Sequence, residues 1–260
     1  MIVLRVALVS LIATSSIALT GCSSLSRMIS APPDPARYAA LVAAPDRTPE
    51  DRALDAGRKP AELLVFTGVT PGMRVAELAA GGGYTAELLA RAVAPTGQVY
   101  GQNTPALLQR FLEKPWSTRL ERPVMKGVIR LDRTLDDPFP ADVKDLDAVL
   151  FVLFYHDTVA LNVDRGRMNR AIFAALKPGG SYVVVDHSGR AGTGTSEGST
   201  LHRIEESVVR GEIEAAGFKL ASEGSFLREP SDPRDWNASP RQAAERRGQS
   251  DRFVLRFVKP

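Results

Sequence analysis

The sequence predicts an α/β protein built on a doubly wound, mostly parallel β-sheet. Residues 73–93 combine a short apolar strand, a glycine turn and a helix in immediate succession. The run 147–155 is continuously apolar rather than alternating, which is typical of a central parallel strand buried on both faces. Strand and helix patterns alternate through most of the chain, and such alternation indicates parallel strands with helices on both faces of the sheet.

The first half of the chain supplies the glycine turn and its neighbours. A helical pattern at 48–66 is broken by Gly57 and Pro60. The strand at 73–78 is followed by glycines that let the backbone bend sharply, because they carry no Cβ. The next helix ends at Val93 and has apolar residues at i, i+1, i+4 and i+5. The following elements are expected to be a strand at 98–101, a short helix at 106–112 and a strand at 124–131.

The second half ends in two strands without a helix between them. A helix at 164–176 stops at 177–180, Lys-Pro-Gly-Gly, since proline cannot continue a helix and glycine suits its cap. A buried strand follows at 181–185. The last elements are expected to be a helix at 205–216 and strands at 218–226 and 252–258. We therefore expect an antiparallel terminal strand pair at the end of the sheet.

The composition is that of an ordinary globular protein with one sizeable core. The chain has 260 residues, of which 44% are hydrophobic and 24% charged, with a formal net charge of +3. Basic and acidic residues are interspersed throughout, so the charge pattern does not favour a nucleic-acid partner.

The first residues have the pattern of an export signal. Arg5 gives a minimal positive start, and 6–19 is an uncharged, mostly apolar run, shorter than the roughly 20 residues of a membrane-spanning helix. The run ends in Leu-Thr-Gly-Cys, and Cys22 is the only cysteine. This ending resembles the lipobox of bacterial lipoproteins, in which the cysteine is lipidated. An uncleaved membrane anchor is the alternative interpretation.

These features predict three segments: a lipoprotein signal peptide at 1–21, a lipidated cysteine with a proline-rich tether at 22–45, and a globular domain at 46–260. The protein is then expected in the cell envelope, anchored to the membrane by lipid on Cys22 and facing the periplasm. Ser23 is not acidic, which favours the outer membrane by analogy with well-studied Gram-negative species. No cysteine remains for a disulfide, so the fold depends on its core.

Four elements of the sequence carry a family resemblance. They are the acidic, glycine-rich 77–83, the Pro-Thr-Gly-Gln-Val-Tyr of 95–100, the Leu-Lys-Pro-Gly-Gly of 176–180 and the final strand pair. Together they resemble class I S-adenosylmethionine-dependent methyltransferases. The resemblance implies a Rossmann-like, seven-stranded sheet, S-adenosylmethionine as cofactor, and methyl transfer to a small-molecule or lipid-like, membrane-associated acceptor. The chain is also similar to exported predicted methyltransferases, through 154–157 and 201–204.

The resemblance places the cofactor by position. It assigns cofactor binding to Glu77, Ala79, Gly81, Gly83, Gln102, Asn103 and Asp132. Glu77 would lie near the methionine end, above a floor formed by the glycine loop. Ala79 replaces the first glycine of the family pattern, a modest change if its backbone is not left-handed. Gln102 and Asn103 stand where the family usually has an acid, so a ribose would be bound more weakly. Asp132 could meet the adenine amino group or serve a structural turn.

Candidate catalytic residues follow the fourth and fifth expected strands. His156 is predicted to be a general base oriented by Asp157, with His187 next in order. Tyr155 either packs against the cofactor, presents its hydroxyl to the acceptor, or is a core aromatic. His202 lies in a connection that usually helps to close the cleft. No metal-ligand spacing is present, so no metal site is expected.

Two further features remain open. Arg52, Asp55 and Lys59 share one helix face, where an i, i+3 salt bridge is the simplest explanation; alternatively, Arg58 or Lys59 reaches a ligand carboxylate. The long polar connection 227–251 is interpreted as a lid.

Two rival functions are also considered. One is a non-catalytic or repurposed ligand-binding protein on the same fold. The other, a dinucleotide-dependent oxidoreductase, is disfavoured because the chain lacks Gly-x-Gly-x-x-Gly.

Overall fold

A seven-stranded sheet organises the chain, with strand order β3-β2-β1-β4-β5-β7-β6. The computed structural model describes Ile2 and residues 34–260. The strands are β1 (Arg74–Leu78), β2 (Gln98–Asn103), β3 (Val128–Asp132), β4 (Leu146–Val152), β5 (Leu176–His187), β6 (Lys219–Gly224) and β7 (Arg252–Val258). β7 is antiparallel to both β5 and β6, whereas β1 to β5 pair in parallel. The predicted fold class, including the antiparallel terminal pair, is therefore confirmed.

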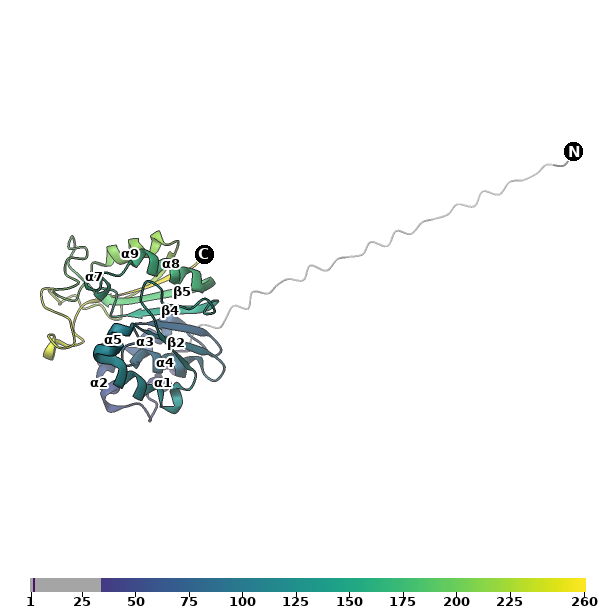
Figure 1. Ribbon diagram of the computed structural model, residues 1–260, viewed down its shortest axis with the longest axis horizontal. Helices are drawn as coiled ribbons and strands as arrows, with labels where there is room; N and C mark the ends of the chain where they lie inside the picture. Colours follow the sequence, from purple (N-terminus) through teal and green to yellow (C-terminus); the bar gives the residue numbers. More distant parts are fainter. Residues whose placement is uncertain (1, 3–33) are drawn as a thin grey trace. The chain divides into compact units, whose positions relative to one another are not determined.

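Helices cover both faces of this sheet (Figure 1). The longer ones are α1 (Pro35–Val42), α2 (Pro49–Arg58), α3 (Pro60–Thr67), α4 (Tyr84–Val93), α6 (Glu113–Leu120), α8 (Arg165–Ala175) and α9 (Glu206–Ala215). Short turns of helix are α5 (Pro105–Leu107), α7 (Asp157–Ala160), a π turn (Leu108–Leu112) and two 3₁₀ turns (Pro123–Met125, Ala244–Arg246).

The core is divided by the sheet into two layers. In β4, Val149 and Phe151 face the layer that contains α8 and α9, whereas Ala148 and Leu150 face the layer that contains α1, α3 and α4. Alternate residues of one strand thus serve opposite faces, as the pleat requires. This explains why the strand sequence is continuously apolar.

The folded region begins before the predicted boundary at residue 46. Helix α1 lies within the range predicted to be a tether, and its Tyr38 is fully buried. The Tyr38 hydroxyl donates to the carbonyl of Val69 at 2.7 Å. The aromatic anchor therefore outweighs the proline-rich composition, and the tether prediction is wrong for α1.

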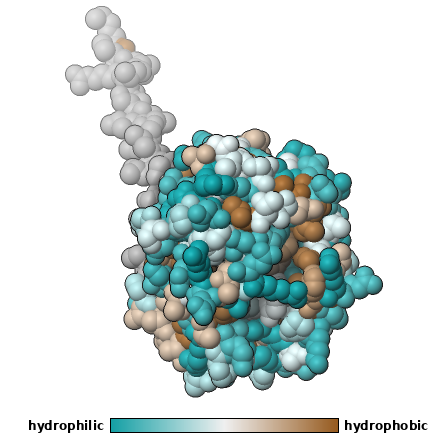
Figure 2. Space-filling view, turned by 90° about the vertical axis from the view of Figure 1, so that its left-hand side faces the viewer, coloured by the Kyte–Doolittle hydropathy of each residue, from teal (hydrophilic) through white to brown (hydrophobic). Residues whose placement is uncertain are grey.

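The predicted signal peptide and Cys22 lie outside the described residues, apart from Ile2. Among the residues that the structure describes, no helix is long and apolar enough to cross a membrane. The face in Figure 2 is largely hydrophilic, with hydrophobic groups scattered across it.

Several boundaries differ from the predictions. β5 begins at Leu176, because Lys177–Gly180 continues the strand instead of forming only a turn. β2 reaches Asn103, two residues beyond the predicted end. The segment predicted as a strand from Val124 first forms a 3₁₀ turn. Of these differences, only the longer β2 changes the carboxyl edge of the sheet, where it places Gln102 and Asn103.

Candidate functional site

The glycine loop between β1 and α4 is fastened to the end of β2. The backbone N–H of Ala79 donates to Gln102 Oε1, and that of Gly81 to Asn103 Oδ1, both at 2.9 Å. Asn103 Nδ2 donates back to the carbonyl of Gly81 at 3.1 Å. Both amide side chains are fully buried. Gln102 and Asn103 therefore hold the loop itself, and neither presents its amide to a ribose.

The loop adopts left-handed backbone at alternate positions. Gly81 and Gly83 have φ values of 60° and 86°, and Ala79 has a φ of 49°. Glycine accepts this region at no steric cost, whereas alanine does not. The condition under which alanine would be a modest change at residue 79, a backbone that is not left-handed, is therefore not met.

Trp116 of α6 explains two of the glycines near this loop. A Cβ on Gly83 would lie 2.6 Å from the Trp116 ring, and one on Gly101 would lie 2.7 Å from it. The indole is fully buried between β2 and the start of α4. These glycines thus admit a protein side chain, which sequence reasoning did not identify.

Glu77, at the end of β1, is a buried carboxyl group with spare hydrogen-bonding capacity. Its Oε2 has no partner in the described structure. Burial raises its pKa to about 8, an effect that Thr85 and the positive charge of Arg58 only partly offset. A buried acceptor of this kind is costly unless a ligand or water completes it.

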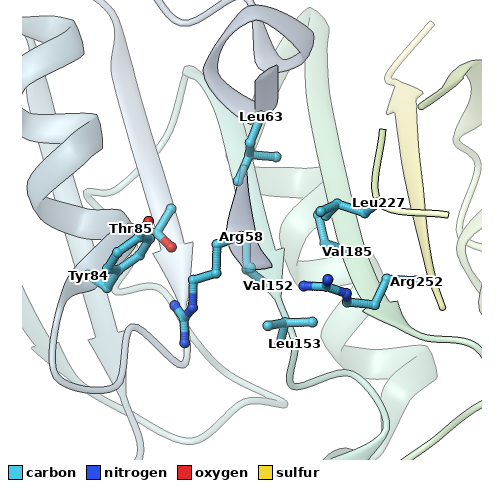
Figure 3. Close-up of a pocket in the computed structure, with 9 residues that line it drawn as sticks. All are labelled: Arg58, Leu63, Tyr84, Thr85, Val152, Leu153, Val185, Leu227 and Arg252. Atoms are coloured by element: carbon cyan, nitrogen blue, oxygen red, sulfur yellow. The ribbon is translucent and has the colours of Figure 1, made fainter. Parts of the chain in front are cut away.

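A pocket adjoins the carboxyl ends of β4 and β5 (Figure 3). It is narrow in this structure, with a cavity volume of about 10 Å³, and its lining includes Arg58, Thr85, Leu153 and Arg252. Figure 3 shows the two arginines on opposite sides, Arg58 at the end of α2 and Arg252 on β7. The pocket thus brings together two cations from distant parts of the sequence.

The two arginines are poorly neutralised. Arg252 donates only to the carbonyls of Gly248 and Ser250, and Arg58 has no ion-pair partner among the described residues. Burial lowers the pKa of Arg58, and burial together with Arg58 lowers that of Arg252 to about 10. One buried and one partly buried guanidinium on opposite sides of the pocket favour an anion between them.

The contacts around Arg58 explain why the nearby carboxylate of Asp55 does not pair with it. Its guanidinium lies over the ring of Tyr84, 4.5 Å from the centroid. The Tyr84 hydroxyl donates to Asp55 at 2.6 Å, and Arg47 binds both oxygens of Asp55 at 2.6 and 2.7 Å. Arg52 donates to backbone carbonyls instead of pairing with Asp55. The simple helix-face salt bridge is therefore wrong.

A larger pocket, with a cavity volume of about 290 Å³, shares Arg58, Leu153 and Arg252 with the first. His187 lines it, together with residues 238–248 of the long connection after β6. The His187 Nδ1 lies 2.7 Å from Ser250 Oγ. Burial, with neighbouring positive charges, lowers the pKa of His187 well below its usual value, so its ring is neutral at neutral pH.

The predicted base, His156, lies in a separate polar cluster. Both its backbone N–H and its Nδ1 lie 2.7 Å from an oxygen of Asp186. Its Nε2 faces His202 Nδ1 at 3.2 Å and Asp157 Oδ2 at 3.4 Å. The orienting carboxylate is therefore Asp186, not Asp157 as predicted. His156 is not among the residues that line either pocket.

Two other predicted residues have partners of their own. The Tyr155 hydroxyl donates to Glu212 at 2.8 Å and accepts from Asn169 at 2.9 Å, so Tyr155 is a hydrogen-bonded core residue. Asp132 pairs with Arg130 at 2.7 Å at the exposed end of β3. Neither side chain is free to meet a cofactor in this arrangement.

Sequence reasoning missed Asp186, Arg252 and Trp116 as contributors to this region. Asp186 could have been found, because β4 and β5 are adjacent parallel strands whose ends lie side by side. Arg252 comes close only through the antiparallel strand β7. No local sequence signal marks Trp116.

Solved structures share this architecture. A search of family models finds none that matches the chain. An S-adenosylmethionine-dependent methyltransferase from Aquifex aeolicus is 16% identical, with a TM-score of 0.57 over 87% of this chain and 99% of its own. A putative sarcosine dimethylglycine methyltransferase from Galdieria sulphuraria is 15% identical, with a TM-score of 0.57 over 81% of this chain and 86% of its own.

A solved structure with the same fold is named for a different activity. The [4+2]-cyclase SpnF is 18% identical, with a TM-score of 0.54 over 81% of each chain. The chain therefore has the fold of S-adenosylmethionine-dependent methyltransferases. At these identities the likeness establishes the architecture alone, and the site residues have to carry the functional argument.

Proposed function

We propose that the protein transfers a methyl group from S-adenosylmethionine to a small-molecule or membrane-associated acceptor. The observation that carries the proposal is the proximity of a buried carboxyl, Glu77, to a partly buried guanidinium, Arg58, beside the glycine loop. Neither Glu77 Oε2 nor Arg58 has a hydrogen-bond or ion-pair partner among residues 34–260. The methionine part of the cofactor has an ammonium and a carboxylate, which complement these two groups. When bound, the cofactor supplies a methyl group on an electrophilic sulfonium.

The residues of the site suit the methionine end of the cofactor better than its ribose. Arg58 has the charge that the carboxylate of the methionine end requires, and Glu77 has an acceptor oxygen without a partner in the described structure for its ammonium. Gln102 and Asn103 are closed off by their bonds to the loop. In the proposal, the loop backbone and the pocket walls therefore contribute the rest of the binding energy, without a ribose carboxylate.

The acceptor is proposed to occupy the larger pocket. Arg252 offers it a cation and His187 a neutral ring, and the 238–248 segment excludes water. His187 is then the histidine on the acceptor side, since it lines the pocket. For His156 to act as the predicted base, its ring would have to give up its hydrogen bond with Asp186 or its contact with His202.

The location of this activity is part of the proposal. The lipobox-like ending at Cys22 supports a lipid-anchored protein of the cell envelope that faces the periplasm. A membrane-associated acceptor would then diffuse in the same plane as the enzyme. Replacing Cys22 with serine and following membrane association by fractionation tests this part separately; unchanged association would contradict it.

A second candidate is a repurposed ligand-binding protein or enzyme on the same fold. Gln102 and Asn103 bind the glycine loop, so their amides do not provide the ribose recognition typical of the family. This favours the second candidate. The cyclase relative adds a case in which this fold is described by a different reaction.

Turnover separates the two candidates. The full chain is incubated with S-adenosylmethionine and panels of alcohols, amines, carboxylates and envelope lipids, and S-adenosylhomocysteine release is measured. The methyltransferase proposal expects acceptor-dependent release that is lost in Arg58→Gln. Cofactor binding without release across the panels would support the second candidate instead.

A further inference from the structure

Two histidine side chains and one aspartate side chain surround a common point near the carboxyl ends of β4 and β5. His156 Nε2, His202 Nδ1 and a carboxylate oxygen of Asp157 all lie within 4.8 Å of one another. The closest pairs are 3.2 Å between the two nitrogens, 3.4 Å from His156 Nε2 to Asp157 Oδ2, and 3.1 Å from His202 Nδ1 to Asp157 Oδ1. Three potential ligand atoms thus converge from two separate chain segments.

These separations match one face of a coordination polyhedron. Nitrogen and oxygen ligands bind divalent transition metals at about 2.0–2.2 Å. At such bond lengths, neighbouring ligand atoms of a tetrahedral or octahedral site lie roughly 3.0–3.4 Å apart. The three distances fall in this interval, but the two to Asp157 end on different oxygens of its carboxylate. A bound ion would therefore meet both oxygens, or one oxygen after a small rotation of the Asp157 side chain.

Asp186 gives an independent reason to assign a ligand role to His156. Asp186 is fully buried and binds the backbone N–H of His156 as well as its Nδ1. A carboxylate only accepts, so Nδ1 carries the proton and Nε2 offers its lone pair. A carboxylate behind a histidine is the arrangement that orients metal-ligating imidazoles.

The local charge also suits a cation. Asp157 and Asp186 are both adjacent to His156, and the nearest arginine, Arg203, is neutralised by Asp232 at 2.8 Å. His202 and Asp157 keep 30% and 23% of their side chains exposed, so the open side of the cluster faces solvent. His202 has a φ of 52°, so the backbone adopts an unfavourable conformation where it presents this ring.

We propose that His156, Asp157 and His202 form a binding site for a divalent transition-metal ion such as Zn²⁺ or Fe²⁺, with Asp186 as the positioning residue. Two imidazoles favour these ions over Mg²⁺ and Ca²⁺, which prefer oxygen ligands. Three protein ligands leave coordination positions for water or a ligand. The site is distinct from the arginine pockets, and the inference does not depend on methyl transfer.

The ligands are absent from any linear motif. His156 and Asp157 are adjacent in the sequence, and His202 comes from the connection between β5 and α9. The prediction of no metal rested on spacing alone, which cannot reveal ligands that the sheet topology brings together.

The competing explanation needs no metal. A proton on His202 Nδ1 could be shared with His156 Nε2 and Asp157, which would give a purely structural hydrogen-bond cluster. Metal titration of the variants distinguishes the two arrangements.

The experiment uses the full chain without an affinity tag, stripped with a chelator and dialysed. Zn²⁺ is titrated by calorimetry, and Co²⁺ is followed by its visible absorption. We expect one ion per chain. Asp186→Asn should weaken binding roughly 10–100-fold, and the ligand changes His202→Asn and Asp157→Asn at least as much. Asparagine accepts the left-handed backbone of residue 202, so this change removes the ring without new strain.

His187→Asn is the matched control, because it removes a neighbouring histidine that is not a ligand. It should retain the wild-type affinity for Zn²⁺, and a Zn²⁺-induced rise in melting temperature should persist in it but not in His202→Asn. No binding by the wild type at micromolar Zn²⁺, or equal affinity in His202→Asn and Asp157→Asn, would overturn the proposal.

Discussion

At the scale of single residues, four of the eight non-glycine residues with left-handed backbone in the described structure lie around the candidate site. Lys59, Ala79, Leu153 and His202 are not glycines, yet their φ values are 43°, 49°, 56° and 52°. Left-handed backbone costs an ordinary residue about 1–2 kcal/mol. Such conformations persist only where the surroundings enforce them, and they concentrate at functional sites. Here they flank Arg58, the glycine loop, the pocket and the cluster of His156, Asp157 and His202.

The strain at Ala79 predicts a stabilising substitution. Ala79→Gly should raise the free energy of unfolding by about 0.5–1 kcal/mol, since the relief of strain exceeds the added entropy of the unfolded chain. Urea unfolding measures the change. Ala80 is the control: its φ is not positive, so Ala80→Gly should be destabilising. A loss of stability in Ala79→Gly equal to that of the control would contradict the left-handed assignment.

Glu77 predicts a pH dependence of stability. Its pKa rises from 4.5 unfolded to about 8 folded, so the folded state holds this proton more tightly. The stabilisation is complete below pH 4.5 and is lost as pH rises through 8, at about 1.4 kcal/mol per pH unit between these values. Glu77→Gln, which cannot titrate, should remove this slope.

Urea unfolding of both proteins from pH 5 to 8.5 tests the Glu77 prediction. The wild type should lose stability relative to Glu77→Gln as the pH rises. The same comparison cancels the contribution of other titrating groups. A difference between the two proteins that stays constant with pH would show that the carboxyl is not protonated in the folded state.

At the scale of elements, the connection 227–251 is an ordered cover for the larger pocket. Its Asp232 forms an ion pair with Arg203, and both side chains are fully buried. Asp232 also accepts from the Trp236 indole and from the backbone of Asp251 at 2.8 and 2.7 Å. The segment was interpreted as a lid from its length, and these contacts give it a fixed closed position.

Breaking this ion pair should loosen the cover. Asp232→Ala leaves a buried guanidinium without its partner, so we expect a loss of about 3–5 kcal/mol in the free energy of unfolding. Limited proteolysis should then cut within 232–250 sooner. Arg210→Ala, which breaks exposed pairs with Glu214 and Glu223, should cost at most about 1 kcal/mol. Equal effects of the two substitutions would contradict the role of Asp232.

At the scale of the whole molecule, the sequence contained most of the fold. Buried parallel strands must be apolar on both faces, so β4 was visible as a continuous run. Because the sequence shows no helix between the last two strands, it predicted that β7 pairs in an antiparallel manner. Helix α1 was missed because its stability depends on burying Tyr38 against the rest of the domain, which composition does not reveal.

The candidate site was less predictable, because it depends on side-chain direction. Gln102 and Asn103 lie where the resemblance places them, but they point into the glycine loop. His156 follows β4 as expected, yet its partner Asp186 comes from the neighbouring strand. Arg252 reaches the pocket only after the chain has returned antiparallel. Each of these contacts joins segments far apart in the sequence.

The main proposal is that S-adenosylmethionine binds at the glycine loop, next to Glu77 and Arg58. Calorimetric titration of the cofactor into the full chain and into Arg58→Gln tests it most directly, with Arg130→Gln as a surface control. We predict measurable binding that Arg58→Gln weakens about tenfold to a hundredfold, as expected for the loss of a charge-assisted hydrogen bond, with no change in the control. No heat at millimolar cofactor, or equal affinity in Arg58→Gln, would contradict the account.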